Sequence, residues 1–200
     1  MVLLLLHALC TVLRKRRRFV GVLTMMAGLV SGVAAASPLG GPPKEFQVKA
    51  VFLYNFAQFV EWPASAFEGP ESPLVIGVLG LDPFGSFLDE TVQGERVNGR
   101  PLVVRRYRSV SEIDRCHILF ISGSESADAA KVAATMKERG VLTVCDWEAT
   151  NWEGSMVRFV MDRGRVRLRI NLESAKEAGL NISSKLLRSA EAVTQSGSIR

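Results

Sequence analysis

Residues 74–80 read Leu-Val-Ile-Gly-Val-Leu-Gly, a short apolar run with a proline directly before it. A continuously apolar run of this length is typical of a strand that is buried on both faces, as in parallel sheets. Asp82 and Pro83 follow and suit the N-cap and the first position of a helix, which we expect over residues 84–92. A buried strand followed at once by a helix predicts the first unit of an α/β domain.

The same alternation continues downstream. We expect strands at residues 101–105, 117–121 and 141–145, and an alanine-rich helix at residues 124–139 that Gly140 ends as its C′ residue. Strands and helices that alternate at this spacing favour a parallel sheet with right-handed crossovers.

The pattern then changes. Residues 156–161 and 165–170 are predicted to form a β-hairpin, because Asp162-Arg163-Gly164 between them is a turn sequence. Helices are expected at residues 172–178 and at 183 to about 193. The predicted fold class is α/β, a three-layer, Rossmann-like, mostly parallel sheet with an appended antiparallel hairpin.

Upstream of the first strand, residues 44–60 carry apolar side chains at spacings of three and four, which predicts a helix that Trp62-Pro63 ends. Its expected core-facing stripe consists of Val48, Val51, Phe52, Asn55, Phe56 and Phe59. Tyr54 falls off this stripe and Phe46 precedes it. Each has two interpretations, which are core packing, favoured here, and an exposed aromatic anchor at an interface.

The N-terminal segment has the composition of an export signal. Two apolar stretches, residues 2–13 and 19–36, flank five consecutive basic residues at 14–18, and the second stretch ends in Ala-Ala-Ala before a serine. We expect a signal peptide at residues 1–36, cleaved between Ala36 and Ser37, a linker at residues 37–45 and export to a bacterial periplasm. An uncleaved membrane anchor is the alternative. The export route, Sec or twin-arginine, stays open, as does an upstream start site for residues 1–12.

The charge distribution supports this interpretation. The chain has 25 Lys and Arg against 20 Asp and Glu, a net charge of +5, and the run at residues 14–18 accounts for the whole excess. The remainder has 20 charges of each sign, which argues against nucleic acid as a partner.

Few residues of the exported part suit catalysis or metal binding. His117 is its only histidine, and at the start of a strand we expect it to be hydrogen-bonded and structural rather than a catalytic base. No G-x-S-x-G motif occurs, and one histidine with two cysteines cannot supply a four-ligand zinc site. Cys145 should lie beside Phe120 in the neighbouring strand, about 13 Å along the strand from Cys116. We therefore expect no disulfide, no metal and no cofactor.

Two places could hold a ligand. Gly80-Leu81-Asp82 follows a buried strand, where α/β proteins bind ligands, although a tight turn is the preferred interpretation and the sequence is no phosphate-binding motif. Arg165, Arg167 and Arg169 alternate along one strand and therefore share a face. A solvated face is expected, and an acidic partner surface or ligand is the alternative.

Several segments together resemble the YfiR-like family (DUF4154) of small periplasmic proteins. They are residues 49–63, 80–85, 116–121, 141–144, 170–171 and 178–187, and the most specific are Tyr-Asn-Phe…Trp-Pro and Ile-Ser-Ser-Lys-Leu-Leu. The resemblance covers residues 46–193 and leaves a tail at residues 194–200. Motif positions that we interpret as structural first are Asn55, Phe56, Pro63, Asn171, Ser183, Ser184 and Lys185. Asn171 and Ser183 are expected to cap helices, with Lys185 inside the last one.

The resemblance implies a periplasmic repressor that binds the extracytoplasmic sensor region of a membrane-bound diguanylate cyclase and restrains cyclic-di-GMP synthesis. A histidine kinase would be a related partner, and self-association as a homodimer is also implied. The family resemblance further implies intrachain disulfides, which the few cysteines of this chain put in doubt. The residues proposed as a partner or ligand surface are Tyr54, Trp62, Asp82, Arg165, Arg167 and Arg169.

We therefore predict a regulator that is not an enzyme. The alternative from another class is a periplasmic small-molecule binding module at Gly80-Leu81-Asp82. An enzyme would need a carboxylate pair such as Asp82 and Asp146, both at predicted strand ends.

Overall fold

The computed structural model describes residues 41–147, 155–188 and 190–193. The expected signal peptide at residues 1–36, its cleavage point between Ala36 and Ser37, and the tail at residues 194–200 lie outside the described residues.

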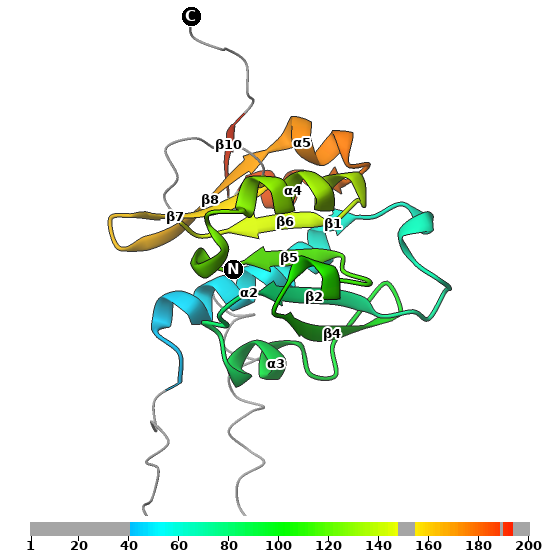
Figure 1. Ribbon diagram of the computed structural model, residues 1–200, viewed down its shortest axis with the longest axis horizontal. Helices are drawn as coiled ribbons and strands as arrows, with labels where there is room; N and C mark the ends of the chain where they lie inside the picture. Colours follow the sequence, from blue (N-terminus) through cyan, green and yellow to red (C-terminus); the bar gives the residue numbers. More distant parts are fainter. Residues whose placement is uncertain (1–40, 148–154, 189, 194–200) are drawn as a thin grey trace, which may run out of the picture. The chain divides into compact units, whose positions relative to one another are not determined.

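A mostly parallel sheet forms the centre of the domain (Figure 1). Its strands in the described residues are β2 (Leu74–Leu79), β3 (Arg96–Val97), β4 (Arg100–Tyr107), β5 (Ile118–Ile121), β6 (Leu142–Cys145), β7 (Val157–Asp162), β8 (Arg165–Asn171) and β10 (Glu191–Val193). They are arranged in the order β10-β8-β7-β6-β5-β2-β4-β3. Strands β4, β2, β5, β6 and β7 are parallel, whereas β3 is antiparallel to β4, and β8 is antiparallel to β7 but parallel to β10. The predicted α/β class with a mostly parallel sheet is confirmed, and the Rossmann-like description stays a prediction.

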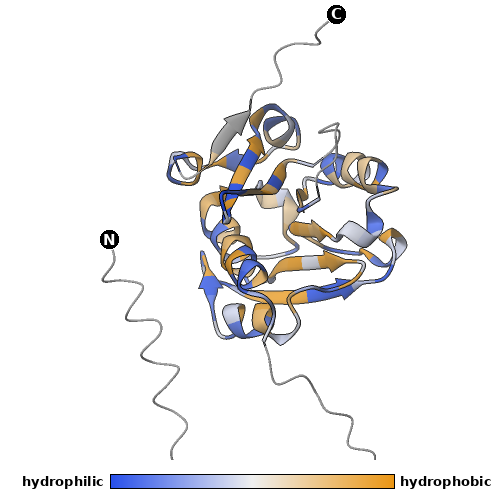
Figure 2. Ribbon diagram, turned by 90° about the vertical axis from the view of Figure 1, so that its left-hand side faces the viewer, coloured by the Kyte–Doolittle hydropathy of each residue, from blue (hydrophilic) through white to orange (hydrophobic). Residues whose placement is uncertain are grey.

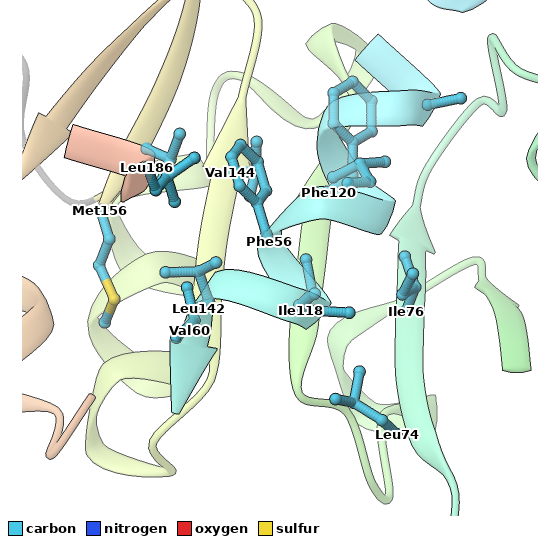
Figure 3. Close-up of a cluster of buried hydrophobic side chains, with 14 of the residues drawn as sticks. Phe56, Val60, Leu74, Ile76, Ile118, Phe120, Leu142, Val144, Met156 and Leu186 are labelled. Carbon is cyan, nitrogen blue, oxygen red and sulfur yellow. The ribbon is translucent and has the colours of Figure 1, made fainter. Parts of the chain in front are cut away.

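Helices cover both faces of this sheet because its inner strands are apolar on both sides. Helices α2 (Lys44–Phe59) and α3 (Ser86–Val92) pack on the face that carries Ile76, Ile118 and Phe120. Figure 3 shows part of this cluster between α2 and the strands, and the central strands are largely orange in Figure 2. Helix α4 (Ala129–Glu138) packs on the opposite face, against Leu119 and Ile121. Alternate residues of one strand therefore enter two separate cores.

The hairpin is part of the main sheet rather than an appendage, because β7 pairs with β6 in parallel as well as with β8. Its turn is as predicted, with positive φ angles at Arg163 (47°) and Gly164 (73°). Two consecutive positive φ angles are characteristic of the type I′ turn, whose twist matches that of a hairpin.

Two helix starts were predicted too early. Helix α3 begins at Ser86 with Gly85 as N-cap, because the Asp82 carboxylate accepts a hydrogen bond from the Phe84 N–H at 2.7 Å and closes a turn there. Helix α4 begins at Ala129, after a 3₁₀ turn at Gly123–Glu125, and Gly140 follows it in the left-handed region as expected (φ 67°).

The helix predicted at residues 183–193 begins where expected but is far too long. Helix α6 (Ser184–Leu187) is a single turn, and Glu191–Val193 forms β10, which pairs with the backbone of β8 in parallel. The unpaired edge of β8 supplies hydrogen-bond partners that outweigh the helical preference of this short segment. Between β8 and α6 lie helix α5 (Leu172–Glu177) and strand β9 (Asn181–Ile182).

The predicted stripe of α2 is wrong in part. Val48 and Val51 are 44% and 42% exposed, whereas the buried residues of α2 are Lys49, Ala50, Leu53, Phe56 and Ala57. The helix is apolar on two adjacent sides, and the side with the small residues Ala50 and Ala57 is the one that approaches the sheet. Burial of Lys49 is possible because its ammonium group pairs with Glu45 and with Asp146.

Candidate functional site

The two most specific motif segments meet in space. Strand β1 (Val60–Glu61) follows α2 directly and pairs antiparallel with β9, which places Val60 beside Ile182. The Asn181 side chain donates to the Glu61 carboxylate at 2.9 Å, and the Ser183 N–H donates to the Phe59 carbonyl at 2.8 Å. The chain thus closes a two-stranded ribbon between segments that are about 120 residues apart.

A groove of about 320 Å³, called the Trp62 groove below, opens beside this ribbon. It lies between the end of α2, β1, the segment that follows β1, and the turn from β3 to β4. Its lining residues are Ala57, Val60, Glu61, Trp62, Phe67, Leu74, Val97, Asn98 and Arg100. The lining combines apolar side chains with the polar groups of Glu61, Asn98 and Arg100, a mixture that is typical of ligand and partner sites.

A stack of flat side chains forms one wall of the groove. The Arg100 guanidinium lies 3.8 Å from the centre of the Phe67 ring, and Phe67 stacks on His117 with ring centroids 4.5 Å apart. Trp62 meets the His117 ring edge-on at 6.1 Å. Arg100 also donates to the carbonyl and the hydroxyl of Ser72, at 3.0 and 2.9 Å. These contacts fix the wall in one arrangement.

His117 is structural, as the sequence predicted. Its Nδ1 accepts a hydrogen bond from the Val75 N–H at 3.0 Å, so Nδ1 carries no proton. Its Nε2 therefore holds the proton and donates it to the Ala66 carbonyl at 3.2 Å. Burial lowers the pKa of His117, and the nearby charges of Arg100 and Arg115 lower it further. Both ring nitrogens are therefore engaged in hydrogen bonds to the backbone.

Trp62 has a buried polar group that the fold leaves unused. Its indole Nε1–H is shielded from solvent and has no acceptor among the described residues. Leaving a buried donor unsatisfied costs about 1–3 kcal/mol, and native proteins leave few such groups. Trp62 is therefore a predicted contact residue whose polar group is not satisfied by the fold.

The other aromatic candidate, Tyr54, is half-buried rather than free. Its hydroxyl donates to the Glu95 carboxylate at 2.8 Å, which ties α2 to the segment before β3. Burial and the Glu95 charge raise the pKa of Tyr54. Asn55 is half-buried beside it, and Pro63 is exposed at the start of the 3₁₀ turn Ala64–Ala66.

The place where an α/β sheet would bind a ligand is filled by the chain itself. Ser124 accepts a hydrogen bond from the Leu81 N–H at 3.1 Å, and a Cβ atom added to Gly80 would lie 2.7 Å from the Glu125 side chain. Asp82 pairs with the Arg106 guanidinium at 2.7 Å. The turn interpretation of Gly80-Leu81-Asp82 therefore describes this segment better than a ligand site does.

The two carboxylates that an enzyme would need are held apart by different cations. Asp82 binds Arg106 after β2, whereas Asp146 lies 3.0 Å from the Lys49 ammonium after β6. Strand β5 separates β2 from β6. The structure therefore does not bring them together as an acid–base pair.

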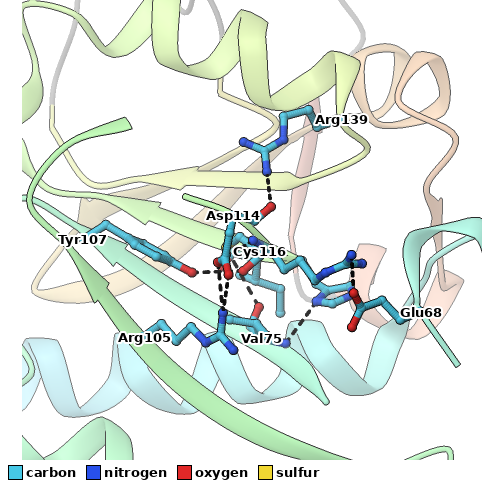
Figure 4. A network of polar contacts seen from close by, with 10 residues as sticks. Glu68, Val75, Arg105, Tyr107, Asp114, Cys116 and Arg139 are labelled. Carbon is cyan, nitrogen blue, oxygen red and sulfur yellow. Dashed lines mark hydrogen bonds and ion pairs between the residues drawn. The ribbon is translucent and has the colours of Figure 1, made fainter. Parts of the chain in front are cut away.

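The cysteines lie in separate buried positions. Cys145 pairs with Ile121, one residue further along than predicted, and both Cys116 and Cys145 are free thiols. Burial raises the pKa of Cys116 to about 12. Around Cys116, a network joins Arg105 to Asp114 at 2.9 Å and the Tyr107 hydroxyl to the Arg115 carbonyl (Figure 4).

The C-terminal motif residues have the capping roles expected of them. Asn171 accepts from the Ser174 N–H at 3.0 Å at the start of α5, and Ser183 accepts from the Lys185 N–H at 3.3 Å at the start of α6. Ser184 and Lys185 are exposed. Arg165 and Arg167 are exposed on β8, and Arg169 on the same strand is half-buried.

Sequence reasoning missed the Lys49–Asp146 pair and the Arg100–Phe67–His117 stack. Neither can be recognised from the spacing of neighbouring residues. Lys49 and Asp146 are 97 residues apart, and the three side chains of the stack come from three different segments. Among the described residues, no group of three or more histidine, cysteine or acidic side chains could hold a metal ion. In the same part of the chain, no helix combines the length and the apolarity needed to cross a membrane.

No curated protein matches the chain. A family model described as YfiR/HmsC-like matches residues 46–191, which include both strands of the ribbon and the residues that line the Trp62 groove. The chain therefore belongs to the YfiR/HmsC-like family.

Proposed function

We propose that this protein is a periplasmic regulator that binds the extracytoplasmic region of a membrane signalling protein, a diguanylate cyclase in the first instance, and restrains cyclic-di-GMP synthesis. The family match over residues 46–191 carries the proposal, because YfiR-like proteins are periplasmic regulators of diguanylate cyclase pathways. The export signal expected at residues 1–36, with a linker at 37–45, would deliver the domain to that compartment.

The geometry supports a binding role. His117 has both nitrogens engaged, and Asp82 and Asp146 are each paired with a cation. The Trp62 groove combines apolar side chains with Glu61, Asn98 and Arg100, and it lies beside an indole N–H that has no acceptor in the described part of the chain. An extended segment of the partner could fill such a groove with an apolar side chain.

The test combines a deletion strain with site-specific crosslinking. Deleting the gene should raise the cyclic-di-GMP level, and expression of the full-length protein in the deletion strain should bring it back to the wild-type level. A photo-crosslinking residue in place of Glu61, an exposed residue at the groove, should capture the membrane cyclase. The same residue in place of Thr135, exposed on α4, is the matched control and should not. Unchanged cyclic-di-GMP together with no cyclase in the crosslinked material would sink the proposal.

The same material tests the accompanying proposals. Mass spectrometry of the periplasmic form should give a chain that begins at Ser37, and sedimentation should give a homodimer. A histidine kinase captured in place of a cyclase would keep the regulator and change its partner. Stabilisation by one class of metabolite, without any protein captured, would instead favour the small-molecule binding module.

A further inference from the structure

The β7–β8 hairpin separates charge from apolar surface. Its register places Arg165 opposite Asp162, Arg167 opposite Val160 and Arg169 opposite Arg158. Because side chains alternate along a strand, these residues share one face of the hairpin, called the arginine face below. The opposite face carries Val157, Phe159, Leu168 and Ile170, which are buried in the core beside α2.

The positive charge at the turn end of the hairpin is largely unneutralised. A hollow of about 280 Å³ is lined by Asp162, Arg163, Arg165 and Arg167. The one carboxylate in this lining, Asp162, lies 3.8 Å from the Arg167 guanidinium, and both side chains are more than half exposed. An ion pair that is so exposed to solvent contributes little stabilisation. Arg163 and Arg165 have no ion-pair partner among the described residues.

This local excess is not a property of the whole domain. Outside residues 14–18 the chain has 20 basic and 20 acidic residues. An arginine-lined hollow on an otherwise balanced protein steers acidic groups to one place on its surface.

We propose that the arginine face is a docking surface for an acidic segment of a partner protein, whose carboxylates enter the hollow at Arg163, Arg165 and Arg167. Guanidinium groups bind carboxylates through two parallel hydrogen bonds. Alternate residues of a strand are about 6.8 Å apart, the same spacing as alternate acidic side chains of an extended segment. The proposal names the partner chemistry for the regulator proposed above and in that respect rests on it.

A protein segment fits this surface better than an anionic membrane does. Insertion into a lipid interface requires an apolar face that can leave the protein. The apolar face of the hairpin is packed against α2, and Met161 is its large exposed residue, at 46%. Arg165 and Arg167 are held in register by their pairing with Asp162 and Val160 of β7, whereas β10 pairs with β8 only at Arg169–Asn171.

The experiment uses the mature protein and a fluorescent hexaglutamate peptide as the probe, followed by anisotropy at low and physiological salt. The double variant R165E/R167E should weaken binding by about tenfold or more, and Asp162→Asn, which removes the carboxylate of the hollow, should strengthen it. Arg108→Glu, a charge reversal at an exposed arginine after β4, is the control and should change affinity less than about twofold. Circular dichroism checks that each variant is folded.

Three results would overturn the proposal. They are unchanged peptide affinity in R165E/R167E, equal weakening by Arg108→Glu, and binding to phosphatidylglycerol vesicles without binding to hexaglutamate. The peptide assay contains no signalling protein, so its failure leaves the regulator proposal standing. Unchanged cyclic-di-GMP in the deletion strain would likewise leave the arginine face to be judged on the peptide data alone.

Discussion

The Nδ1 atom of His117 accepts a hydrogen bond from the Val75 N–H at 3.0 Å, and this bond holds the imidazole neutral beside the Trp62 groove. Protonation of Nδ1 would remove the acceptor. Burial lowers the pKa of His117 in the folded protein below the value of about 6.5 that it has when unfolded. The unfolded state therefore binds more protons below that pH, so stability is full above about pH 6.5 and falls as the pH drops towards the folded-state pKa.

Urea unfolding at several pH values between 7.5 and 5.5 tests this dependence. In His117→Asn the amide oxygen can take the place of Nδ1 as the acceptor, and the group does not titrate. We expect this variant to be less stable than the wild type at pH 7.5 and to lose less stability on acidification. If the free energy of unfolding of this variant changes with pH as steeply as that of the wild type, His117 is not the group that causes the pH dependence.

Gly77 has no room for a side chain. A Cβ atom there would lie 2.7 Å from the Cys116 sulfur and 2.8 Å from the Tyr107 ring. Gly77→Ala should therefore lower the free energy of unfolding by about 1–3 kcal/mol, the usual cost of overpacking. The second substitution Cys116→Ala should recover part of that loss. Gly123→Ala is the control, since nothing lies within 4 Å of the added atom, and a similar loss there would contradict the steric explanation.

The Lys49–Asp146 pair joins α2 to the end of β6. The Lys49 side chain is 3% exposed and Asp146 13%, so removal of the cation leaves a poorly solvated carboxylate. Lys49→Met, which keeps the packing over Phe46, should lower the free energy of unfolding by about 2–4 kcal/mol in urea titrations. The double variant with Lys49→Met and Asp146→Asn should lose less free energy of unfolding than the sum of the losses in the two single variants. Additive losses would mean that the two groups are not coupled.

Elements that depend on a local pattern were predictable, and elements that depend on a distant partner were not. The buried strand at residues 74–79, the type I′ turn and the caps at Asn171 and Ser183 each follow from a few neighbouring residues. Strands β1, β9 and β10 form because another segment pairs with them. Their sequences of two or three residues contain no period that could be recognised.

The same distinction holds for the candidate site. The aromatic motif singled out Trp62, and alternation singled out Arg165 and Arg167. Phe67 and Arg100 complete the wall beside Trp62. They do so because the segment after β1 folds back onto Arg100 of β4 and onto His117, directly before β5. The sequence pattern of α2 also does not show which side of the helix is buried, because the helix is apolar on two sides. Small residues and the Lys49 ion pairs decide it.

Trp62 offers a test in which stability and function should separate. Trp62→Phe removes the indole N–H that lacks an acceptor and keeps an aromatic ring against His117. Removing an unsatisfied buried donor offsets the lost packing area, so the free energy of unfolding should change by less than about 1 kcal/mol. If binding exposes the shielded indole and a partner supplies the missing acceptor, the same variant should restore cyclic-di-GMP control in the deletion strain poorly. Trp62→Ala, which also removes the ring, should lower both stability and control. A Trp62→Phe variant with full control would show that the indole N–H takes no part in partner binding.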